Sequence, residues 1–218
     1  MTRLLVSVDV GGTLGRVDGP SLTTILAEVS PLDPVEARSI MRQRLHTQPS
    51  ISSEVVADVC DALRIPVSAF PRDVEPPLLR PVPGALTALR SMSQHATLVT
   101  LSNVTCLEGG TNQVRDLLHP WVQSHFQSYR MGYAKPDPAA FRYVAHACHA
   151  STTHMVHIGD DWTCDIVGAR LAEVTAIWIS NGRPVPEPER LSDHGVLVAA
   201  DIVAASRLLA HLALRRRS

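Results

Sequence analysis

The chain has 218 residues, of which 45% are hydrophobic and 19% charged, a balance typical of globular proteins that excludes a disordered or coiled-coil chain. This length accommodates one domain, or one core with a small insertion. The formal net charge of −1 provides no overall field that would attract nucleic acid or an anionic membrane. The basic run at residues 215–217 is expected to be a solvated tail.

No apolar stretch approaches the roughly 20 residues that a membrane span requires. The apolar run before Asp9 is too short for a secretory signal. The four cysteines are scattered and form no Cys-x-x-Cys pair, which favours reduced thiols. We therefore expect a cytoplasmic protein with no membrane and no nucleic-acid partner. Its oligomeric state has no signature in the sequence.

The N-terminal third changes from a strand pattern to a helical pattern. Residues 4–8 form a short apolar run that leads into a glycine-rich turn, which predicts a buried strand. Between residues 16 and 80, apolar residues recur at helical spacing, which predicts helices at 22–29, 35–45 and 55–63. A proline-rich stretch at 76–84 ends this segment. The pattern indicates a small helical insertion.

Strands and helices then alternate to the C-terminus. Strands are predicted at 96–101, 155–158 and 176–179, and helices at 85–92, 112–126, 138–150, 166–172 and 201–214. Apolar strands interleaved with amphipathic helices are typical of a parallel sheet covered on both faces. The fold class predicted is therefore α/β.

Three of the predicted strands end in polar residues, namely Asp9, Ser102 and Asp160. Because ligands bind outside the carboxyl ends of parallel strands, these side chains are expected to converge. Their types suggest phosphoryl transfer, with Asp9 as a nucleophile that forms an aspartyl-phosphate. Asp9, Asp160 and Asp165 would hold Mg²⁺, which prefers oxygen ligands. Thr13 and Ser102 would bind phosphate oxygens.

One basic residue differs from all the others. Of the 20 basic residues, 19 are arginines and one is a lysine, Lys135. A composition that favours arginine this strongly suggests that Lys135 serves where a compact ammonium is needed. With the metal, Lys135 would offset the negative charge of the carboxylates and the phosphate.

These residues belong to motifs that occur in a fixed order. The motifs are LVSVDVGGTL at 5–14, VPGAL at 82–86, LVTLSN at 98–103, KPDP at 135–138 and GDDWTCD at 159–165. Together they resemble the haloacid dehalogenase (HAD) superfamily, in the subgroup with a helical cap after the first motif. The resemblance implies a Rossmann-like core over residues 1–15 and 81–218, with a cap over residues 16–80.

The resemblance also implies the metal ligands. Asp9 would be both nucleophile and metal ligand, and the backbone carbonyl of Gly11 would also contact the metal. Asp160 would ligate Mg²⁺, while Asp165 would ligate it or orient it through water. Asp161 is an alternative ligand.

The residues expected to bind the substrate follow from the same motifs. Ser102 and Lys135 would bind the phosphoryl group. Thr13 and Asn103, the residue next to Ser102, are also expected to bind the substrate. Arg16 would either reach a substrate phosphate or form a salt bridge at the hinge of the cap.

One position departs from the family pattern. Most phosphatases of this family carry a second Asp two residues after the nucleophile, as a general acid, but here that residue is Gly11. General acid–base catalysis contributes roughly 10²- to 10⁴-fold. Therefore the leaving group is good, a cap residue substitutes, or turnover is slow. Asp18 and His46 are the cap residues considered, although surface positions are expected for both.

The function expected is Mg²⁺-dependent hydrolysis of a small phosphorylated metabolite. The first alternative is a HAD-like protein that binds a phosphorylated ligand or partner without turnover. A sugar kinase of the actin-like fold would need a second glycine-rich ATP motif, which the sequence lacks. Dehalogenases of the family use no metal, which the acidic loop 160–165 disfavours. The histidines between 146 and 157 have no zinc spacing and are expected in the core or on the surface.

Overall fold

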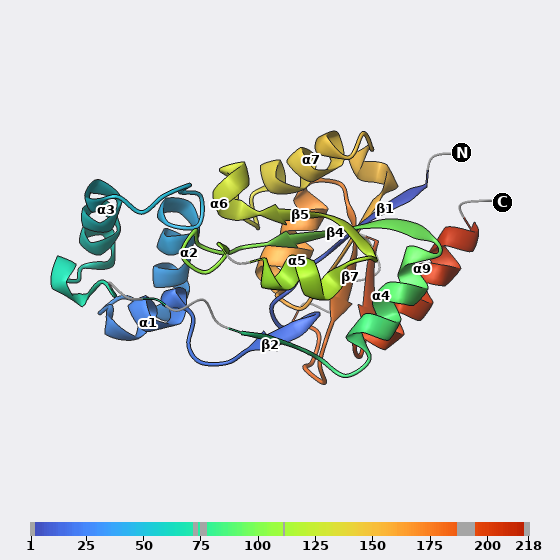
Figure 1. The fold of residues 1–218 in the computed structure, drawn as a ribbon, viewed down its shortest axis with the longest axis horizontal. Helices are drawn as coiled ribbons and strands as arrows, with labels where there is room; N and C mark the ends of the chain where they lie inside the picture. Colours follow the sequence, from blue (N-terminus) through green and yellow to red (C-terminus); the bar gives the residue numbers. More distant parts are fainter. Residues whose placement is uncertain (1–2, 72–73, 75–77, 111, 187–194, 216–218) are drawn as a thin grey trace.

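A computed structural model describes residues 3–71, 74, 78–110, 112–186 and 195–215. Residues 76–77 of the proline-rich stretch and residues 216–217 of the basic run therefore lie outside the described residues. The core is a six-stranded sheet in the order β5-β4-β1-β6-β7-β8, with all neighbouring strands parallel. Helices cover both faces, so the predicted Rossmann-like α/β fold is confirmed (Figure 1). Across the described ranges, no helix combines the length and apolar character needed to cross a bilayer.

The elements of the core alternate along the chain. The strands of the sheet are β1 (Leu4–Val8), β4 (Ala96–Ser102), β5 (Val122–Gln127), β6 (Met155–Gly159), β7 (Thr175–Ile179) and β8 (Val196–Ala199). The helices of the core are α4 (Ala85–Ser93), α5 (Gln113–Leu118), α6 (Ser128–Met131), α7 (Pro138–Ala147), α8 (Gly168–Leu171) and α9 (Ile202–Arg215).

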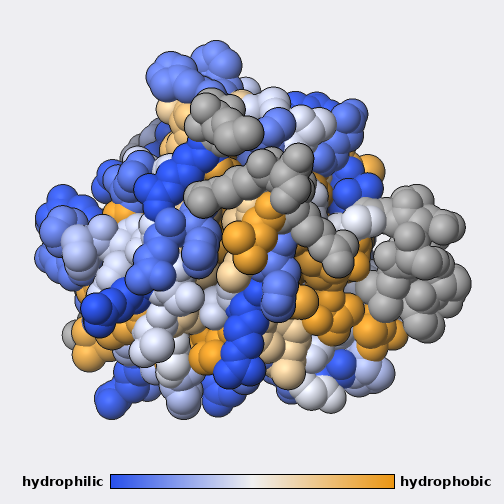
Figure 2. Space-filling model, turned by 90° about the vertical axis from the view of Figure 1, so that its right-hand side faces the viewer, coloured by the Kyte–Doolittle hydropathy of each residue, from blue (hydrophilic) through white to orange (hydrophobic). Residues whose placement is uncertain are grey.

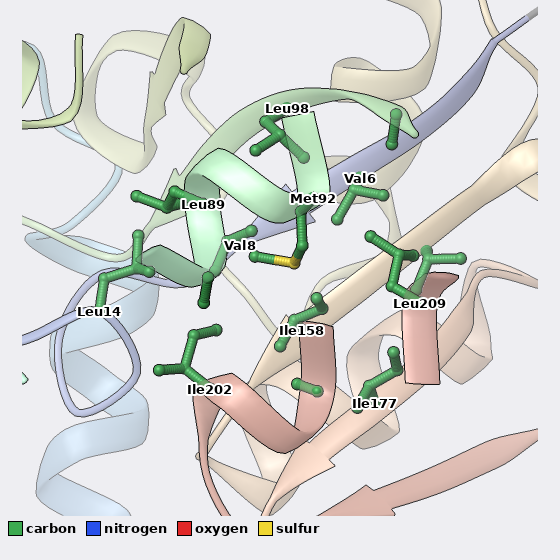
Figure 3. Packing of buried hydrophobic residues seen from close by; sticks show 14 of the residues in the cluster. Val6, Val8, Leu14, Leu89, Met92, Leu98, Ile158, Ile177, Ile202 and Leu209 are labelled. Atoms are coloured by element: carbon green, nitrogen blue, oxygen red, sulfur yellow. The ribbon is translucent and has the colours of Figure 1, made fainter. Parts of the chain in front are cut away.

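Two hydrophobic clusters hold the sheet between its helices. Because side chains alternate along a strand, Val6 and Val8 of β1 pack on one face and Leu5 packs on the other. The first face packs against α4 and α9, through residues such as Leu89 and Leu209 (Figure 3). The second face packs against α7 and α8. Burial on both faces places β1 at the centre of the sheet, which fixes the position of Asp9.

A separate helical segment follows β1. Strands β2 (Gly15–Val17) and β3 (Leu79–Pro81) pair antiparallel, and the chain between them forms α1 (Leu22–Val29), α2 (Pro34–Arg44), α3 (Ser53–Leu63) and a 3-10 turn (Val67–Ala69). Side chains of Ser21, Asp33 and Ser52 cap the three helices. The helices enclose their own hydrophobic cluster. These helices lie at one end of the molecule (Figure 1). The surface at the opposite end carries hydrophobic residues among hydrophilic ones (Figure 2).

The structure corrects one predicted element. The helix predicted over 112–126 is wrong in its second half, because α5 ends at Leu118 and β5 begins at Val122. Pro120 lies between them, and proline both lacks a backbone donor and disfavours helix in the preceding residue.

Strand β8 has no counterpart among the predicted strands. It is a short edge strand with one buried residue of four, so it lacks the apolar run that identified the inner strands.

Candidate active site

The strand ends that carry polar residues come together in the fold. β4 and β6 are the two neighbours of β1, so Ser102 at the end of β4 and Asp160 after β6 flank Asp9. All three line a cavity of about 530 Å³ together with Lys135. The cavity is also lined by residues of α2, so it lies between the carboxyl edge of the sheet and the helical segment.

Three carboxylates form a compact cluster in this cavity. Each of Asp9, Asp160 and Asp165 offers an oxygen, and these oxygens lie within 4.8 Å of one another. Burial raises the pKa of Asp9 to about 7, and the neighbouring charges of Asp165 and Asp160 add to this against the opposing charge of Lys135. Burial and Asp165 also raise the pKa of Asp160. Negative charge in excess on oxygen ligands fits a divalent cation such as Mg²⁺.

Lys135 provides the positive charge of the cluster. Its side chain is 2% exposed, and Nζ donates to Asp9 Oδ1 at 2.7 Å and to Asp165 Oδ1 at 2.6 Å. Burial alone would lower the pKa of Lys135, but the two carboxylates outweigh burial and raise it. The backbone of Lys135 is fixed by Asn103, whose amide donates to the carbonyl at 2.6 Å and accepts from the N–H at 2.8 Å. Lys135 is therefore held both at its backbone and at its ammonium group.

Asp165 is held by three donors. Besides Lys135, it accepts hydrogen bonds from His157 Nε2 at 3.1 Å and from the backbone N–H of Asp161 at 2.9 Å. Burial would raise the pKa of Asp165, but Lys135 and His157 hold it below its ordinary value. Since Nε2 donates to a carboxylate, His157 Nδ1 accepts from the Ser7 hydroxyl at 2.7 Å. These hydrogen bonds fix the orientation of the Asp165 carboxylate.

The sequence interpretation missed the roles of Ser7 and His157. Both are buried and directly opposite each other in the register of β1 and β6. The signal that would have found them is a polar residue within a fully apolar strand, since a buried polar group needs a partner.

Asp160 is fixed mainly through its backbone. Its carbonyl accepts from Trp178 Nε1 at 3.0 Å and from Arg183 at 2.6 Å, while Thr13 Oγ1 donates to its carboxylate at 3.3 Å. The loop after β1 allows this close approach because Gly12 has φ +80° and a Cβ there would lie 2.6 Å from Asp160 Oδ1. Trp178 and Arg183 carried no motif and were also missed by the sequence interpretation.

Gly11 differs from Gly12. A Cβ added at Gly11 meets no atom within 4 Å, so this position has room for a larger residue. The departure from the family pattern therefore leaves open space beside Asp9 in the loop that follows β1.

The residues expected to bind substrate fall into two groups. Ser102 lines the cavity, and its buried Oγ has no hydrogen-bond partner among the described residues, so it is available to a ligand. Thr13 instead contacts Asp160, and the Asn103 amide is engaged with Lys135. Arg16 does not line the cavity. The salt bridge near the hinge joins Arg80 and Asp18, in place of one from Arg16.

Asp161, the alternative metal ligand, has a different contact. Its carboxylate accepts from the N–H of Cys164 at 2.8 Å and caps the π-helical segment Trp162–Val167 that leads into α8. It lines the cavity but is not in the cluster of three carboxylates.

His46 is not a surface residue, contrary to the sequence-based expectation. It is 6% exposed, lines the cavity and pairs through Nε2 with the Thr23 hydroxyl at 2.9 Å. Its Nδ1 is buried and has no hydrogen-bond partner among the described residues. Burial, together with the charge of Arg42, lowers the pKa of His46 to about 4. The imidazole is therefore neutral near pH 7.

This burial predicts acid sensitivity. His46 stays neutral in the folded chain down to about pH 4, whereas in the unfolded chain it takes up a proton near the ordinary histidine pKa of 6.5. The free energy of unfolding therefore falls as the pH drops from 6.5 to 4, by about 3 kcal/mol from this group. His46→Gln should flatten that part of a urea-unfolding pH profile. The exposed His146→Gln is the matched control, and an unchanged slope in His46→Gln would contradict the prediction.

Comparisons with known proteins agree with this architecture. Residues 132–205 match the HAD-hydrolase-like family model. A phosphoserine phosphatase of Thermus thermophilus is 36% identical over 66 residues, a match that covers 30% of this chain and 26% of that protein. The chain thus spans about a quarter of the curated relative that it matches.

Solved structures match over almost the whole chain. A 2-haloacid dehalogenase from Pseudomonas syringae is 18% identical with a TM-score of 0.61, covering 97% of this chain and 100% of that chain. The magnesium-bound HAD-hydrolase YfnB from Bacillus subtilis is 19% identical with a TM-score of 0.62, covering 96% and 99%. A HAD phosphatase from Thermococcus onnurineus is 14% identical with a TM-score of 0.58, covering 95% and 98%. The family match therefore covers residues 132–205, and the solved structures show that the chain shares its fold with HAD hydrolases over almost its whole length.

Proposed function

We propose that the chain is a Mg²⁺-dependent phosphatase that hydrolyses a small phosphorylated metabolite through an aspartyl-phosphate on Asp9. The observation that carries this proposal is the cluster of Asp9, Asp160 and Asp165 with Lys135 at the carboxyl edge of the sheet. Asp9, Asp160 and the backbone carbonyl of Gly11 would hold the metal, and Asp165 would orient it. When bound, Mg²⁺ would neutralise charge on the phosphoryl oxygens.

The protein residues divide the remaining work. A carboxylate oxygen of Asp9 attacks phosphorus, and the bond from phosphorus to the ester oxygen breaks as the Asp9–phosphorus bond forms. The ester oxygen leaves with the bonding electron pair and takes a proton from water, because Gly11 has no acidic side chain. Lys135 favours the ionised form of Asp9 and binds a phosphoryl oxygen, and the free Ser102 hydroxyl donates to another. Water then attacks phosphorus and releases inorganic phosphate and Asp9.

We include the helical segment in this proposal as a cap. The core would comprise residues 1–15 and 81–218, and the cap residues 16–80. The cavity extends from the sheet edge to α2, so closure of the cap would exclude bulk water during transfer.

The matched phosphoserine phosphatase supports a phosphate ester as substrate, whereas several solved structures with this fold are dehalogenases. The three carboxylates favour the phosphatase, because without a cation they repel one another around the nucleophile. The alternative is a protein that binds a phosphorylated ligand without turnover. It is supported by Gly11, which leaves open space where most phosphatases of the family carry a general acid.

The test is phosphate release from a panel of phosphate esters and acyl phosphates, with Mg²⁺ and with EDTA. Metal-dependent release from at least one ester is the expected result. Release of halide from a 2-haloacid, or no release from any compound, would contradict the proposal.

The open space at Gly11 makes a second prediction. Gly11→Asp places a carboxyl group beside Asp9 without a clash, and a general acid there should raise kcat for esters with poor leaving groups by about tenfold or more. For acyl phosphates, whose leaving group needs little protonation, kcat should change little. The matched control is Gly12→Asp, which clashes with Asp160 and should lower activity on both. A loss on poor leaving groups in Gly11→Asp would show that acid–base help already comes from elsewhere.

A further inference from the structure

The cavity has two walls of opposite charge. The wall at the sheet edge carries the carboxylates described above. The remainder of the lining carries four arginines, Arg38, Arg42, Arg115 and Arg130. Among the acidic residues of the lining, Glu108 alone lies outside the first motif and the 160–165 loop, and both its oxygens are engaged, with the N–H of Leu22 at 2.9 Å and the Thr105 hydroxyl at 2.8 Å. Arg115 pairs with Asp116 at 3.2 Å, and the other three arginines leave the lining outside these motifs with an excess of basic side chains, which we call the basic wall.

Three of the residues on this wall form a stripe along α2. Arg38, Arg42 and His46 follow one another at intervals of four, which places them on one face of the helix and of the turn after it. Arg38 is exposed, Arg42 is half-buried and His46 is buried, so the stripe runs from solvent into the cavity.

The two charged groups on this stripe and one nitrogen of His46 have no partner among the described residues. Arg44, on another face of the same helix, forms an ion pair with Asp58 of α3. Neither Arg38 nor Arg42 forms an ion pair with a described residue, and His46 Nδ1 is buried without a hydrogen bond. A half-buried guanidinium with no carboxylate beside it favours an anionic ligand, which it can bind with two parallel hydrogen bonds.

Arg42 also borders the cavity that contains the reacting groups. Arg42 lines the same cavity as Cys164. Since Cys164 belongs to the loop that carries Asp160 and Asp165, Arg42 and that loop border the same space.

We propose that the substrate carries a second acidic group, a carboxylate or a phosphate, which Arg42 and Arg38 bind while its phosphoryl group lies at Asp9. This inference rests on the proposed function and adds a substrate class to it. His46 and Thr23 border the same wall and contact the part of the substrate between its two acidic ends.

The test compares matched substrates. One set comprises ω-phosphooxy carboxylic acids with two to six carbons, the second the corresponding alkyl phosphates, and the third the α,ω-bisphosphates. For the wild type, kcat/KM should be about 10- to 100-fold higher for the best acid or bisphosphate than for its alkyl phosphate. Arg42→Gln should remove most of that preference, and Arg38→Gln should reduce it. Arg44→Gln, on the same helix, should retain it.

The sets also distinguish the two forms of second group. A preference in the acid set identifies a carboxylate, and one restricted to the bisphosphates identifies a phosphate. Equal kcat/KM for charged and neutral members in the wild type, or an equal loss in Arg44→Gln and Arg42→Gln, would overturn the inference.

A binding measurement separates this inference from the proposed function. The α,ω-bisphosphates should raise the Tm of the wild type and of Arg44→Gln, but not that of Arg42→Gln. If no compound is hydrolysed while this Arg42-dependent shift persists, the proposed function fails and the anion site stands. If neither hydrolysis nor the shift is seen, both fail.

Discussion

Asp9→Asn should lower phosphate release by about 10⁴-fold or more, because an amide replaces the attacking carboxylate. Asp9 follows the central strand β1 and contacts Lys135 at 2.7 Å, so the substitution preserves the shape of the site and removes the proposed nucleophile. The measurement is phosphate release with Mg²⁺ on the best substrate of the panel, with acid-quenched protein tested for bound phosphate. Wild type should trap a phosphoenzyme, and Asp9→Asn should not.

The loss of activity should not come from unfolding. Burial and neighbouring carboxylates raise the pKa of Asp9 to about 7, so its ionised form near neutral pH lowers the stability of the metal-free fold. Asp9→Asn should therefore have a Tm in EDTA equal to or above that of the wild type. A fully active variant would remove Asp9 from the mechanism, and a lower Tm would contradict the electrostatic account of the cluster.

Lys135→Met should have the largest effect on stability. The ammonium is 2% exposed and hydrogen-bonded to both Asp9 and Asp165, so its removal leaves two buried carboxylates without a counter-charge. Breaking such a buried pair from one side costs about 3–5 kcal/mol. For a chain of this size we expect a fall in Tm of about 10 °C in EDTA, together with loss of activity.

A double variant tests the cause of that loss. Asp9→Asn added to Lys135→Met removes one of the unpaired carboxylates and should recover part of the lost Tm, whereas Asp18→Asn, an exposed carboxylate paired with Arg80, should recover none. An unchanged Tm in Lys135→Met, or equal recovery by both second substitutions, would show that the buried charges are not coupled as described.

The sequence alone identified the parts of the site that depend on strand ends. Apolar runs too short for helices located β1, β4, β6 and β7, and the rule that ligands bind at carboxyl ends brought Asp9, Ser102 and Asp160 to one place. The lone lysine in an arginine-rich chain indicated Lys135 before its contacts were known. These inferences were possible because they depend on local patterning and on residue type.

Only the tertiary structure decided which polar groups support those residues. Ser7 with His157, and Arg183 with Trp178, act on Asp165 and Asp160 through contacts between segments distant in the chain, which no local pattern encodes. It also showed that the Thr13 and Asn103 side chains contact Asp160 and Lys135.

The edge strands of the sheet and the basic wall of the cavity also could not be recognised from local sequence patterns. Strands β5 and β8 each contain one buried residue, so their sequences show no continuous apolar run. The stripe of Arg38, Arg42 and His46 is a helical face in the sequence, but a helical face with arginines is equally typical of solvent exposure. Its meaning depends on α2 lining the same cavity as Asp9, and packing between the helical segment and the core determines that position.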